Sequence, residues 1–280
     1  MLDAVSGLSD TDLAAIADLE RRVIAHDGSR LKLEWGALRG RSGDQVDDLL
    51  WRDDEKVLGF LGFYSFGPDL EFAGMVDPAV RRTGIATAML AAATPIARDR
   101  GFTTALLVTP RATAAGKAFA AASGAGFHHS EHFLALGATP ADAPIDPRVR
   151  LRPATTADTQ EVRRILAAAF DEPERDLTIV ADDPIERVIV IERDHTTVGV
   201  LRLAREGEAV GIYGFAVDPR LQGQGIGRDT LTRICREARA DGVTVVTLEV
   251  AVDNDRALEL YLSVGFEPQA TEDYYAISLT

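Results

Sequence analysis

Two glycine-rich segments of this chain have the residue types and the spacing of an anion-binding loop. The later one, residues 218–227, reads Asp-Pro-Arg-Leu-Gln-Gly-Gln-Gly-Ile-Gly and lies between an apolar run and a helical pattern that opens at Arg228. The earlier one, residues 77–86, reads Asp-Pro-Ala-Val-Arg-Arg-Thr-Gly-Ile-Ala. Where a strand leads through glycines into a helix, free N–H groups and the positive end of the helix dipole converge. We therefore expect an anion site at each segment.

The two segments belong to a long internal repeat. Val76 matches Val217 and Gly84 matches Gly225, so equivalent residues lie 141 positions apart. Solenoid repeats have periods of roughly 20–50 residues, so a repeat of this length indicates a duplicated domain. We predict an N-terminal domain at 1–138, a C-terminal domain at 149–280, and a linker rich in proline and alanine at 137–147.

The apolar pattern predicts the same alternation of strands and helices in each half. Helices are indicated by one apolar face, as at Leu231, Ile234 and Cys235, and strands by β-branched runs. Pro95 is expected to kink or end the helix in which it lies. The predicted strands are 56–66, 70–76, 103–109, 149–152, 187–193, 198–204, 209–217, 243–250 and 274–279, and the predicted helices are 12–25, 85–100, 114–123, 155–170, 228–242 and 256–264.

Three phosphate-loop patterns compete for the glycine-rich segments. A P-loop needs a lysine and a hydroxyl after its last glycine, whereas the later segment continues with Arg228 and Asp229. A dinucleotide-binding loop needs a third glycine at a position where this chain has Arg228. In favour of this pattern, Glu249 lies at about the sequence distance from the loop that is expected for the acidic residue that contacts the ribose. The pattern that both segments satisfy is Gln/Arg-x-x-Gly-x-Gly/Ala, which we therefore favour.

A second informative stretch, residues 248–266, reads Leu-Glu-Val-Ala-Val-Asp-Asn-Asp-Arg-Ala-Leu-Glu-Leu-Tyr-Leu-Ser-Val-Gly-Phe. Together with the two loop segments, it makes the chain resemble the GNAT superfamily of N-acetyltransferases over essentially its whole length, as a tandem pair. The later half is most similar to the peptide and ribosomal-protein N-acetyltransferases. The resemblance implies an α/β (α+β) fold of two GNAT-like domains, each a mixed, mainly antiparallel central sheet flanked by helices.

The resemblance also implies acetyl-coenzyme A as the acetyl donor, with its diphosphate on the glycine-rich loop. The strand that ends at residue 217 should diverge from the strand at 243–250, so that backbone groups near 215–217 bond the pantetheine arm and polarise the thioester carbonyl. The expected cofactor contacts are Phe215, Ala216, Val217, Gln222, Gly223, Gln224, Gly225, Ile226, Gly227, Arg228, Asn254 and Tyr261 in the later half, and Val76, Arg81, Arg82, Thr83, Gly84, Ile85 and Ala86 in the earlier half.

Acetyl transfer to an amine requires two proton movements. An alkyl ammonium has a pKa of about 10.4, so a base must accept its proton at neutral pH. Glu249, near the end of its strand, is the candidate base, acting through water; alternatively it is a structural carboxylate. Tyr261 matches the general acid of the family, which protonates the departing thiolate; alternatively it is a packed core tyrosine. Asn254 resembles a residue that bonds the cofactor arm, or it is an ordinary helix N-cap.

The earlier half departs from the family pattern where the chemistry would occur. Ala122 and Ala115 stand in the places of Tyr261 and Asn254. Glu71 is either a base or a strand-edge carboxylate. We therefore expect the N-terminal domain to be degenerate, a scaffold whose loop can still hold coenzyme A, and the C-terminal domain to be catalytic.

The amino-acid composition limits the classes of partner that the protein is expected to bind. The formal net charge of −14 disfavours nucleic acid and suits a cationic acceptor. The single cysteine excludes an internal disulfide, and the histidines have no recognisable metal-ligand spacing, so no metal site is predicted. The N-terminal residues do not form a secretory signal, and no apolar run is long enough to cross a bilayer. We expect a cytoplasmic protein, as a monomer or homodimer.

The sequence thus predicts an acetyl-CoA-dependent N-acetyltransferase that acts on a primary amine of a small molecule or a peptide. One alternative is a non-catalytic acyl-CoA-binding sensor or scaffold. Another is an acetyltransferase for an amino-sugar thiol, because the tandem layout is similar to that of mycothiol synthase. The identity of the amine is not contained in the motifs.

Overall fold

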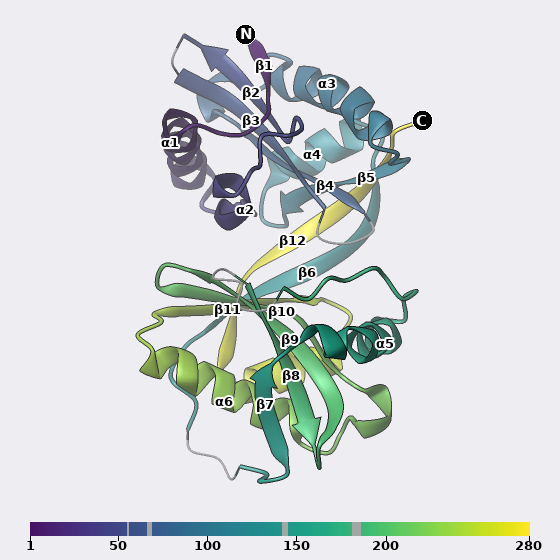
Figure 1. The fold of residues 1–280 in the computed structure, drawn as a ribbon. Helices are drawn as coiled ribbons and strands as arrows, with labels where there is room; N and C mark the ends of the chain where they lie inside the picture. Colours follow the sequence, from purple (N-terminus) through teal and green to yellow (C-terminus); the bar gives the residue numbers. More distant parts are fainter. Residues whose placement is uncertain (55, 66–68, 142–144, 181–185) are drawn as a thin grey trace. The chain divides into compact units, whose positions relative to one another are not determined.

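A computed structural model of the chain describes residues 1–54, 56–65, 69–141, 145–180 and 186–280. The chain forms two compact units: unit 1 is Met1–Glu131 with Ala270–Thr280, and unit 2 is His132–Gln269 (Figure 1). The domain limits 1–138 and 149–280 remain predictions; in the compact units, the last residues of the chain lie with unit 1. Residues 142–144 of the predicted linker lie outside the described residues.

Unit 1 is a sheet with helices on both faces. Its strand order is β1-β2-β3-β4-β5-β12, antiparallel except for the parallel pair β4–β5. Its elements are β1 (Leu2–Val5), α1 (Asp10–Asp27), α2 (Trp35–Arg39), β2 (Asp48–Asp53), β3 (Lys56–Tyr64), β4 (Leu70–Val76), the short 3-10 helix η1 (Pro78–Val80), α3 (Ile85–Asp99), β5 (Thr104–Pro110), α4 (Ala114–Ala122), the first part of β6 (Gly126–Leu136) and the last part of β12 (Phe266–Ser278).

Unit 2 repeats this plan. Its strand order is β7-β8-β9-β10-β11-β6, with β10–β11 as the parallel pair. Its further elements are β7 (Val149–Pro153), η2 (Thr156–Asp158), α5 (Thr159–Phe170), β8 (Glu186–Arg193), β9 (Thr196–Glu206), β10 (Ala209–Val217), η3 (Pro219–Leu221), α6 (Ile226–Ala240), β11 (Val245–Ala251) and α7 (Asp255–Val264). The predicted fold, two mixed and mainly antiparallel α/β domains, is confirmed.

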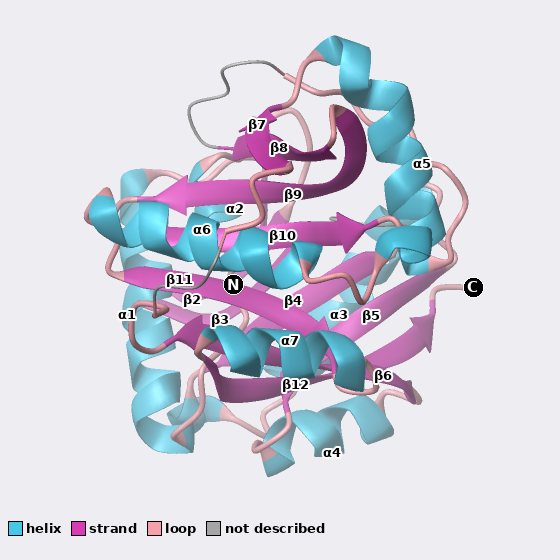
Figure 2. Cartoon of the chain, turned by 90° about the horizontal axis from the view of Figure 1, so that it is seen from below, coloured by secondary structure: helices cyan, strands magenta, loops and turns pink. Residues whose placement is uncertain are grey.

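The helices of unit 2 lie on opposite faces of its sheet, because neighbouring residues of a strand pack against different helices. Ile189 and Ile191 of β8 pack in the cluster that contains α6 and α7, whereas Val190 packs in the cluster that contains α5. Successive strand residues point to opposite faces, so the two helix layers cover opposite sides (Figure 2). Each fully buried aliphatic side chain of this kind contributes roughly 1.5–3 kcal/mol.

The last strand of the chain completes the sheet of unit 1. β12 pairs with β5 over seven residues, from Glu272 opposite Pro110 to Ser278 opposite Thr104. Tyr274, which is fully buried, accepts a hydrogen bond from Lys32 Nζ at 2.5 Å and donates one to Glu131 at 2.6 Å. Buried polar groups must be hydrogen-bonded to be tolerated, so this network ties β12 to the rest of unit 1.

Several predicted elements need correction. α3 continues through Pro95 to Asp99, so the proline does not end the helix. The sequence patterns missed β1, β2, α2 and β6, which are short or lie in segments without clear periodicity. β12 begins eight residues before the predicted start at 274. Among the described residues, no helix is long and apolar enough to cross a membrane.

Candidate functional site

The predicted loop has the same construction in both units. In unit 2, β10 ends at Val217, η3 follows, and α6 begins after Gly225; in unit 1, β4, η1 and α3 are arranged in the same way. Gly225 has φ 82° and Gly84 has φ 93°, both left-handed, and neither helix start has a side-chain cap. Glycine adopts this conformation without strain, which is why the pattern requires it at this position.

Backbone amides at each loop are available to a ligand. Within the part of the chain that the structure describes, the N–H groups of residues 223–228 and 82–87 donate to no carbonyl or side chain. The three loop residues before each helix are exposed at 223–225 and 82–84. Consecutive free N–H groups at a helix N-terminus form a concave site for an anion such as a diphosphate.

The first residue of the Gln/Arg-x-x-Gly pattern anchors the loop to its strand. Gln222 Nε2 donates to the carbonyl oxygen of Val217 at 3.0 Å, and Arg81 Nε donates to that of Val76 at 3.2 Å. Arg81 also forms two hydrogen bonds to Asp27, at 2.8 and 2.7 Å. These predicted cofactor contacts therefore hold the loop through their side chains, so any contact they make with a ligand comes from the backbone.

An aspartate directly after each strand also anchors the loop through hydrogen bonds. The sequence analysis did not predict this role. Asp218 accepts hydrogen bonds from the backbone N–H of Arg220 at 3.0 Å and from Arg164 of α5 at 2.7 Å. The side-chain bond from Arg220, opposed by burial and reinforced by Arg164, holds the pKa of Asp218 well below its usual range. Asp77 accepts equivalent bonds in unit 1. The Asp-Pro pair that occurs at the same place in both halves is the sequence feature from which this role could have been predicted.

The central parallel strands separate next to each loop. β10 pairs with β11 only from Ala209 to Ile212, although β10 continues to Val217. β4 and β5 likewise pair from Leu70 to Ala73. In unit 2 the β9–β10 register also shifts between residues 213 and 216, and Gly214 has φ 54°. The register of β3 with β4 in unit 1, from Gly59 opposite Val76 to Tyr64 opposite Glu71, has no such shift. Bulges are frequent beside active sites because they redirect backbone groups, so unit 2 has the more specialised geometry.

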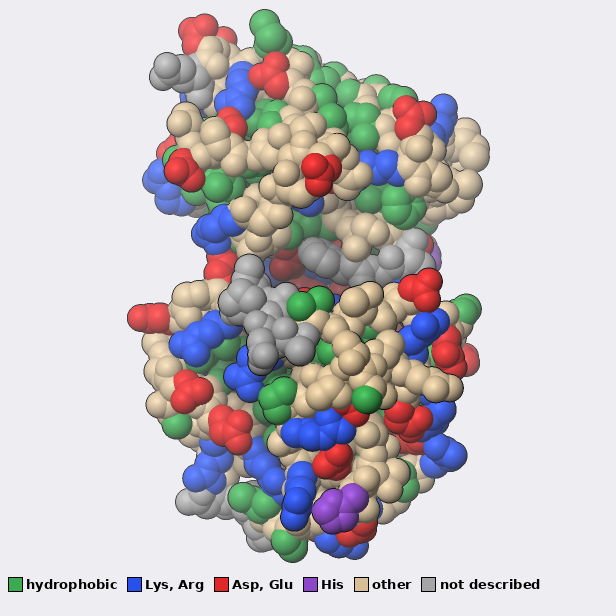
Figure 3. All heavy atoms as spheres, in the orientation of Figure 1, with side chains coloured by type: hydrophobic (Ala, Val, Ile, Leu, Met, Phe, Trp, Pro, Cys, Tyr) green, Lys and Arg blue, Asp and Glu red, His purple; other side chains and the backbone are tan. Residues whose placement is uncertain are grey.

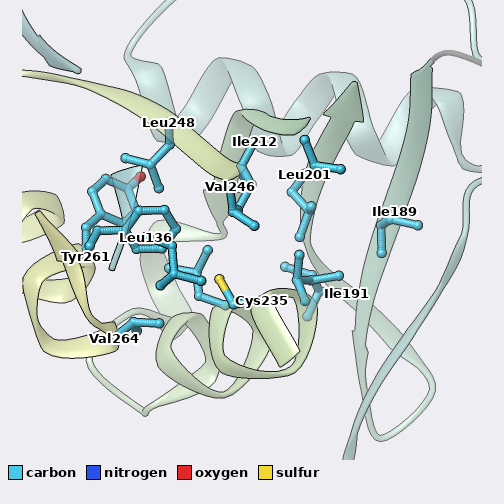
Figure 4. Close-up of a cluster of buried hydrophobic side chains, with 14 of the residues drawn as sticks. Leu136, Ile189, Ile191, Leu201, Ile212, Cys235, Val246, Leu248, Tyr261 and Val264 are labelled. Carbon is cyan, nitrogen blue, oxygen red and sulfur yellow. The ribbon is translucent and has the colours of Figure 1, made fainter. Parts of the chain in front are cut away.

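The candidate acid and base of unit 2 lie at this separation. Glu249 follows Leu248, the last residue of β11 that pairs with β10, and it is half-buried. Tyr261 of α7 is 7% exposed and belongs to the same core cluster as Leu248, and Figure 4 shows its oxygen on the side that faces Leu248. Burial raises the pKa of Tyr261 to about 12. Among the described residues, no group hydrogen-bonds its hydroxyl.

The remaining predicted contacts in unit 2 have identifiable structural roles. Asn254 is exposed and caps α7, because its Oδ1 accepts from the N–H of Ala257 at 3.0 Å. Gly227 allows α6 and α7 to approach, since a Cβ there would lie 3.1 Å from Leu260. Arg228 Nε donates to Ser263 at 3.2 Å. Phe215, Ala216, Gly223, Gln224 and Ile226 line the loop or the strand that leads to it.

Unit 1 contains a cavity of about 490 Å³ at its own strand separation. The cavity is lined by the loop at Gly84 and Ile85, by β4 and β5, and by α4, including Ala122. Two hydroxyls on its wall, of Thr109 and Thr113, are buried and have no hydrogen-bond partner among the described residues. Unit 1 therefore combines the free amides of the loop with a cavity beside it.

The two units thus repeat one arrangement, a loop of free backbone N–H groups beside separated strands. Known proteins are similar to this chain in sequence and fold. Residues 15–125 and 158–266 each match the acetyltransferase (GNAT) family. The mycothiol acetyltransferase of Brachybacterium faecium is 31% identical over 231 residues, which cover 74% of this chain and 68% of that protein. The N-alpha-acetyltransferase RimI of Mycobacterium tuberculosis is 41% identical over 88 residues, 30% of this chain and 54% of that protein. The chain belongs to the acetyltransferase (GNAT) family.

Solved structures show the same tandem fold. A GCN5-related N-acetyltransferase from Sphaerobacter thermophilus superposes with a TM-score of 0.81 at 16% identity, covering 100% of this chain and 95% of that one. A tandem GNAT protein from the clavulanic acid biosynthesis pathway has a TM-score of 0.69 at 16% identity, with coverage of 100% and 99%. The family match and the acetyltransferase relatives confirm the prediction of an N-acetyltransferase.

Proposed function

We propose that unit 2 transfers an acetyl group from acetyl-CoA to a primary amine, and that both loops bind coenzyme A. The observation that carries the proposal is the run of free N–H groups at residues 223–228, repeated at 82–87. Each charge-assisted hydrogen bond from such a group to a phosphate contributes roughly 1.5–3 kcal/mol. A few such bonds are sufficient for ordinary micromolar cofactor affinity.

Acetyl-CoA supplies the activated acetyl group, and the side chains of unit 2 handle the protons. Glu249 takes the proton of the acceptor ammonium through water, which leaves a neutral amine able to form the new C–N bond. As the C–S bond breaks, the hydroxyl of Tyr261 donates its proton to the sulfur, and the nitrogen of the new amide loses its second proton, which returns to Tyr261 through water. Because the pKa of Tyr261 is about 12, this hydroxyl is protonated at neutral pH. Positioned acid–base groups accelerate such reactions by about 10²–10⁴-fold.

The acceptor is proposed to be cationic. The net charge of −14 favours an ammonium-bearing molecule, and acidic and basic side chains are interspersed on the face of unit 2 seen in Figure 3. An amino-sugar thiol is a specific candidate, because the relative that matches 74% of this chain is named as a mycothiol acetyltransferase. A panel that includes a polyamine, a peptide amine and an amino-sugar thiol distinguishes these acceptors.

Matched glycine variants test where coenzyme A binds. Gly225→Glu places bulk and negative charge at the unit 2 loop, where a Cβ meets no atom within 4 Å but the φ of 82° adds backbone strain that the control variant below must match. We expect calorimetry to show two binding sites in the wild type and one in the variant, with at least about a hundredfold weaker binding at the lost site because two or more phosphate bonds disappear. Turnover should vanish in Gly225→Glu and persist in Gly84→Glu.

The control for this pair is Gly242→Glu, at the opposite end of α6. Gly242 has φ 79° and open space around its Cβ position, so the substitution introduces the same charge and the same backbone strain away from the loop. It should bind coenzyme A at both sites. Unchanged affinity at unit 2 in Gly225→Glu would refute the placement of the diphosphate.

A further inference from the structure

The cavity of unit 1 differs from the corresponding region of unit 2 in the size of the side chains along its helix wall. The wall of α4 consists largely of small residues, among them Ala115, Gly116, Ala118 and Ala122. The two helices place Ala120, and not Ala122 as expected from the sequence, opposite Tyr261, because α4 begins at Ala114 and α7 at Asp255, 141 residues apart. Ala120 lines the cavity of about 490 Å³ in unit 1, whereas unit 2 has an aromatic side chain packed in the core at this position. Ligand sites for small molecules have volumes of about 300–1,000 Å³.

The cavity reaches both faces of the unit 1 sheet. Phe60 and Leu61 are neighbours on β3, so their side chains point to opposite faces, yet both line the cavity. Leu61 packs with α3 and α4, and Phe60 packs with α1 and α2. The cavity therefore leads from the loop, through the separation of β4 and β5, to the α1 side of the sheet.

Polar groups occur on the part of the wall formed by β5 and the start of α4. Thr109 is 6% exposed, and its hydroxyl and that of Thr113 have no partner among the described residues. A Cβ on Gly116 would lie 1.7 Å from Thr109 Oγ1, so the glycine lets α4 pack against this hydroxyl. Both hydroxyl oxygens are inaccessible in this packing, so the polar groups open to a ligand are backbone groups where β4 and β5 no longer pair, beyond Ala73 and Val108. The amides of a pantetheine arm that follows the separated strands can bond such groups.

The α1 side of the cavity is apolar. Its wall there includes Val23, Leu31, Phe60, Met75 and Val108. The carboxylate that also lines the cavity, Asp27, is paired with Arg81 and is therefore not presented to an ammonium group. A hydrocarbon gains roughly fourfold in affinity for each methylene that it buries in such surroundings. An ammonium acceptor would find no counter-charge among these five side chains.

We propose that unit 1 is a binding site for coenzyme A thioesters whose acyl group is a hydrocarbon chain longer than acetyl. This inference rests on the proposed binding of coenzyme A at the loop of residues 82–87. The loop holds the diphosphate, the separated ends of β4 and β5 bond the pantetheine arm, and the apolar α1 side receives the acyl chain. Unit 1 thereby senses or stores an acyl thioester that unit 2 does not use.

The test titrates acetyl-, butanoyl- and octanoyl-CoA into the full chain carrying Gly225→Glu, in which unit 1 is the remaining site. Octanoyl-CoA is expected to bind at least about tenfold more tightly than acetyl-CoA, with a stoichiometry of one. Adding Leu31→Phe fills the α1 side of the cavity and should abolish this preference while acetyl-CoA binding persists. That persistence shows that the variant is folded.

Two outcomes separate the inference from the proposed function. Equal or weaker binding of octanoyl-CoA in Gly225→Glu overturns the inference and leaves coenzyme A binding at unit 1 intact. Failure of every thioester to bind Gly225→Glu, together with binding of acetyl-CoA to Gly84→Glu, removes unit 1 from the proposed function and the inference with it. A preference that survives Leu31→Phe contradicts the assignment of the acyl chain to the α1 side.

Discussion

Replacing Tyr261 with phenylalanine is expected to lower kcat by about 10²–10⁴-fold while the affinity for acetyl-CoA changes less than about threefold. The substitution removes the proposed proton donor and leaves the ring in place. Stability should change little, because no group among the described residues hydrogen-bonds the hydroxyl. The measurement is the release of coenzyme A thiol with saturating amine, alongside calorimetry with acetyl-CoA.

Tyr275→Phe provides the control, since it removes the same atom from a half-buried tyrosine of unit 1. Its kcat should equal that of the wild type. The pH profile adds a second check: a pKa of about 12 keeps Tyr261 protonated, so kcat should not fall between pH 8 and about 10 through loss of this proton. Wild-type turnover in Tyr261→Phe would exclude the tyrosine as the acid.

Deleting residues 270–280 is expected to destabilise unit 1 by more than about 5 kcal/mol, although unit 1 consists mostly of residues from the start of the chain. The deletion removes the seven residue pairs between β12 and β5, together with Tyr274 and Leu279, both fully buried. Loss of one large buried side chain costs about 2–5 kcal/mol, and a whole domain is stable by only about 5–15 kcal/mol. Hydrogen exchange at Thr104–Pro110 should therefore lose its protection.

A synthetic peptide of residues 266–280 serves as the control for the deletion. Peptides can add as strands to an exposed sheet edge, so at high concentration this one should restore protection of β5. A peptide in which aspartate replaces Tyr274 should fail, because the residue is fully buried beside two carboxylates, those of Glu131 and Glu71, that share Lys32. Full protection of β5 in the deleted chain would contradict the role of β12 in unit 1.

Much of the fold was predictable because the patterns that specify it are local. Strand β10 has the predicted bounds, and the helices α3, α4, α6 and α7 lie within about two residues of their predicted starts. The N-terminal strands β1 and β2 and the short helix α2 were missed, since short elements have too few residues for periodicity to be recognised. Of the kink or break expected at Pro95, the break is wrong, because α3 continues for four residues beyond the proline.

The sequence predicted the backbone conformation of the loop at the candidate site, but only some of the side chains that anchor it. The glycine-rich loop follows from residue types alone, because a left-handed residue before a helix favours glycine. The anchoring of the loop by Asp218, Arg164 and Gln222 was not foreseen, since Arg164 lies 54 residues before its partner. The catalytic roles of Glu249 and Tyr261 remain predictions that the kinetic experiments will decide.

By itself, the sequence determined that the chain contains two copies of one α/β plan, each with a loop of free amides at a helix start, because those features depend on residues within a few positions of one another. Only the tertiary structure decided that residues 270–280 complete unit 1, where Tyr274 meets Lys32 across 242 positions, and that unit 1 has a cavity beside its loop. Pairing between distant segments depends on the fit of whole surfaces, and no local pattern records that fit.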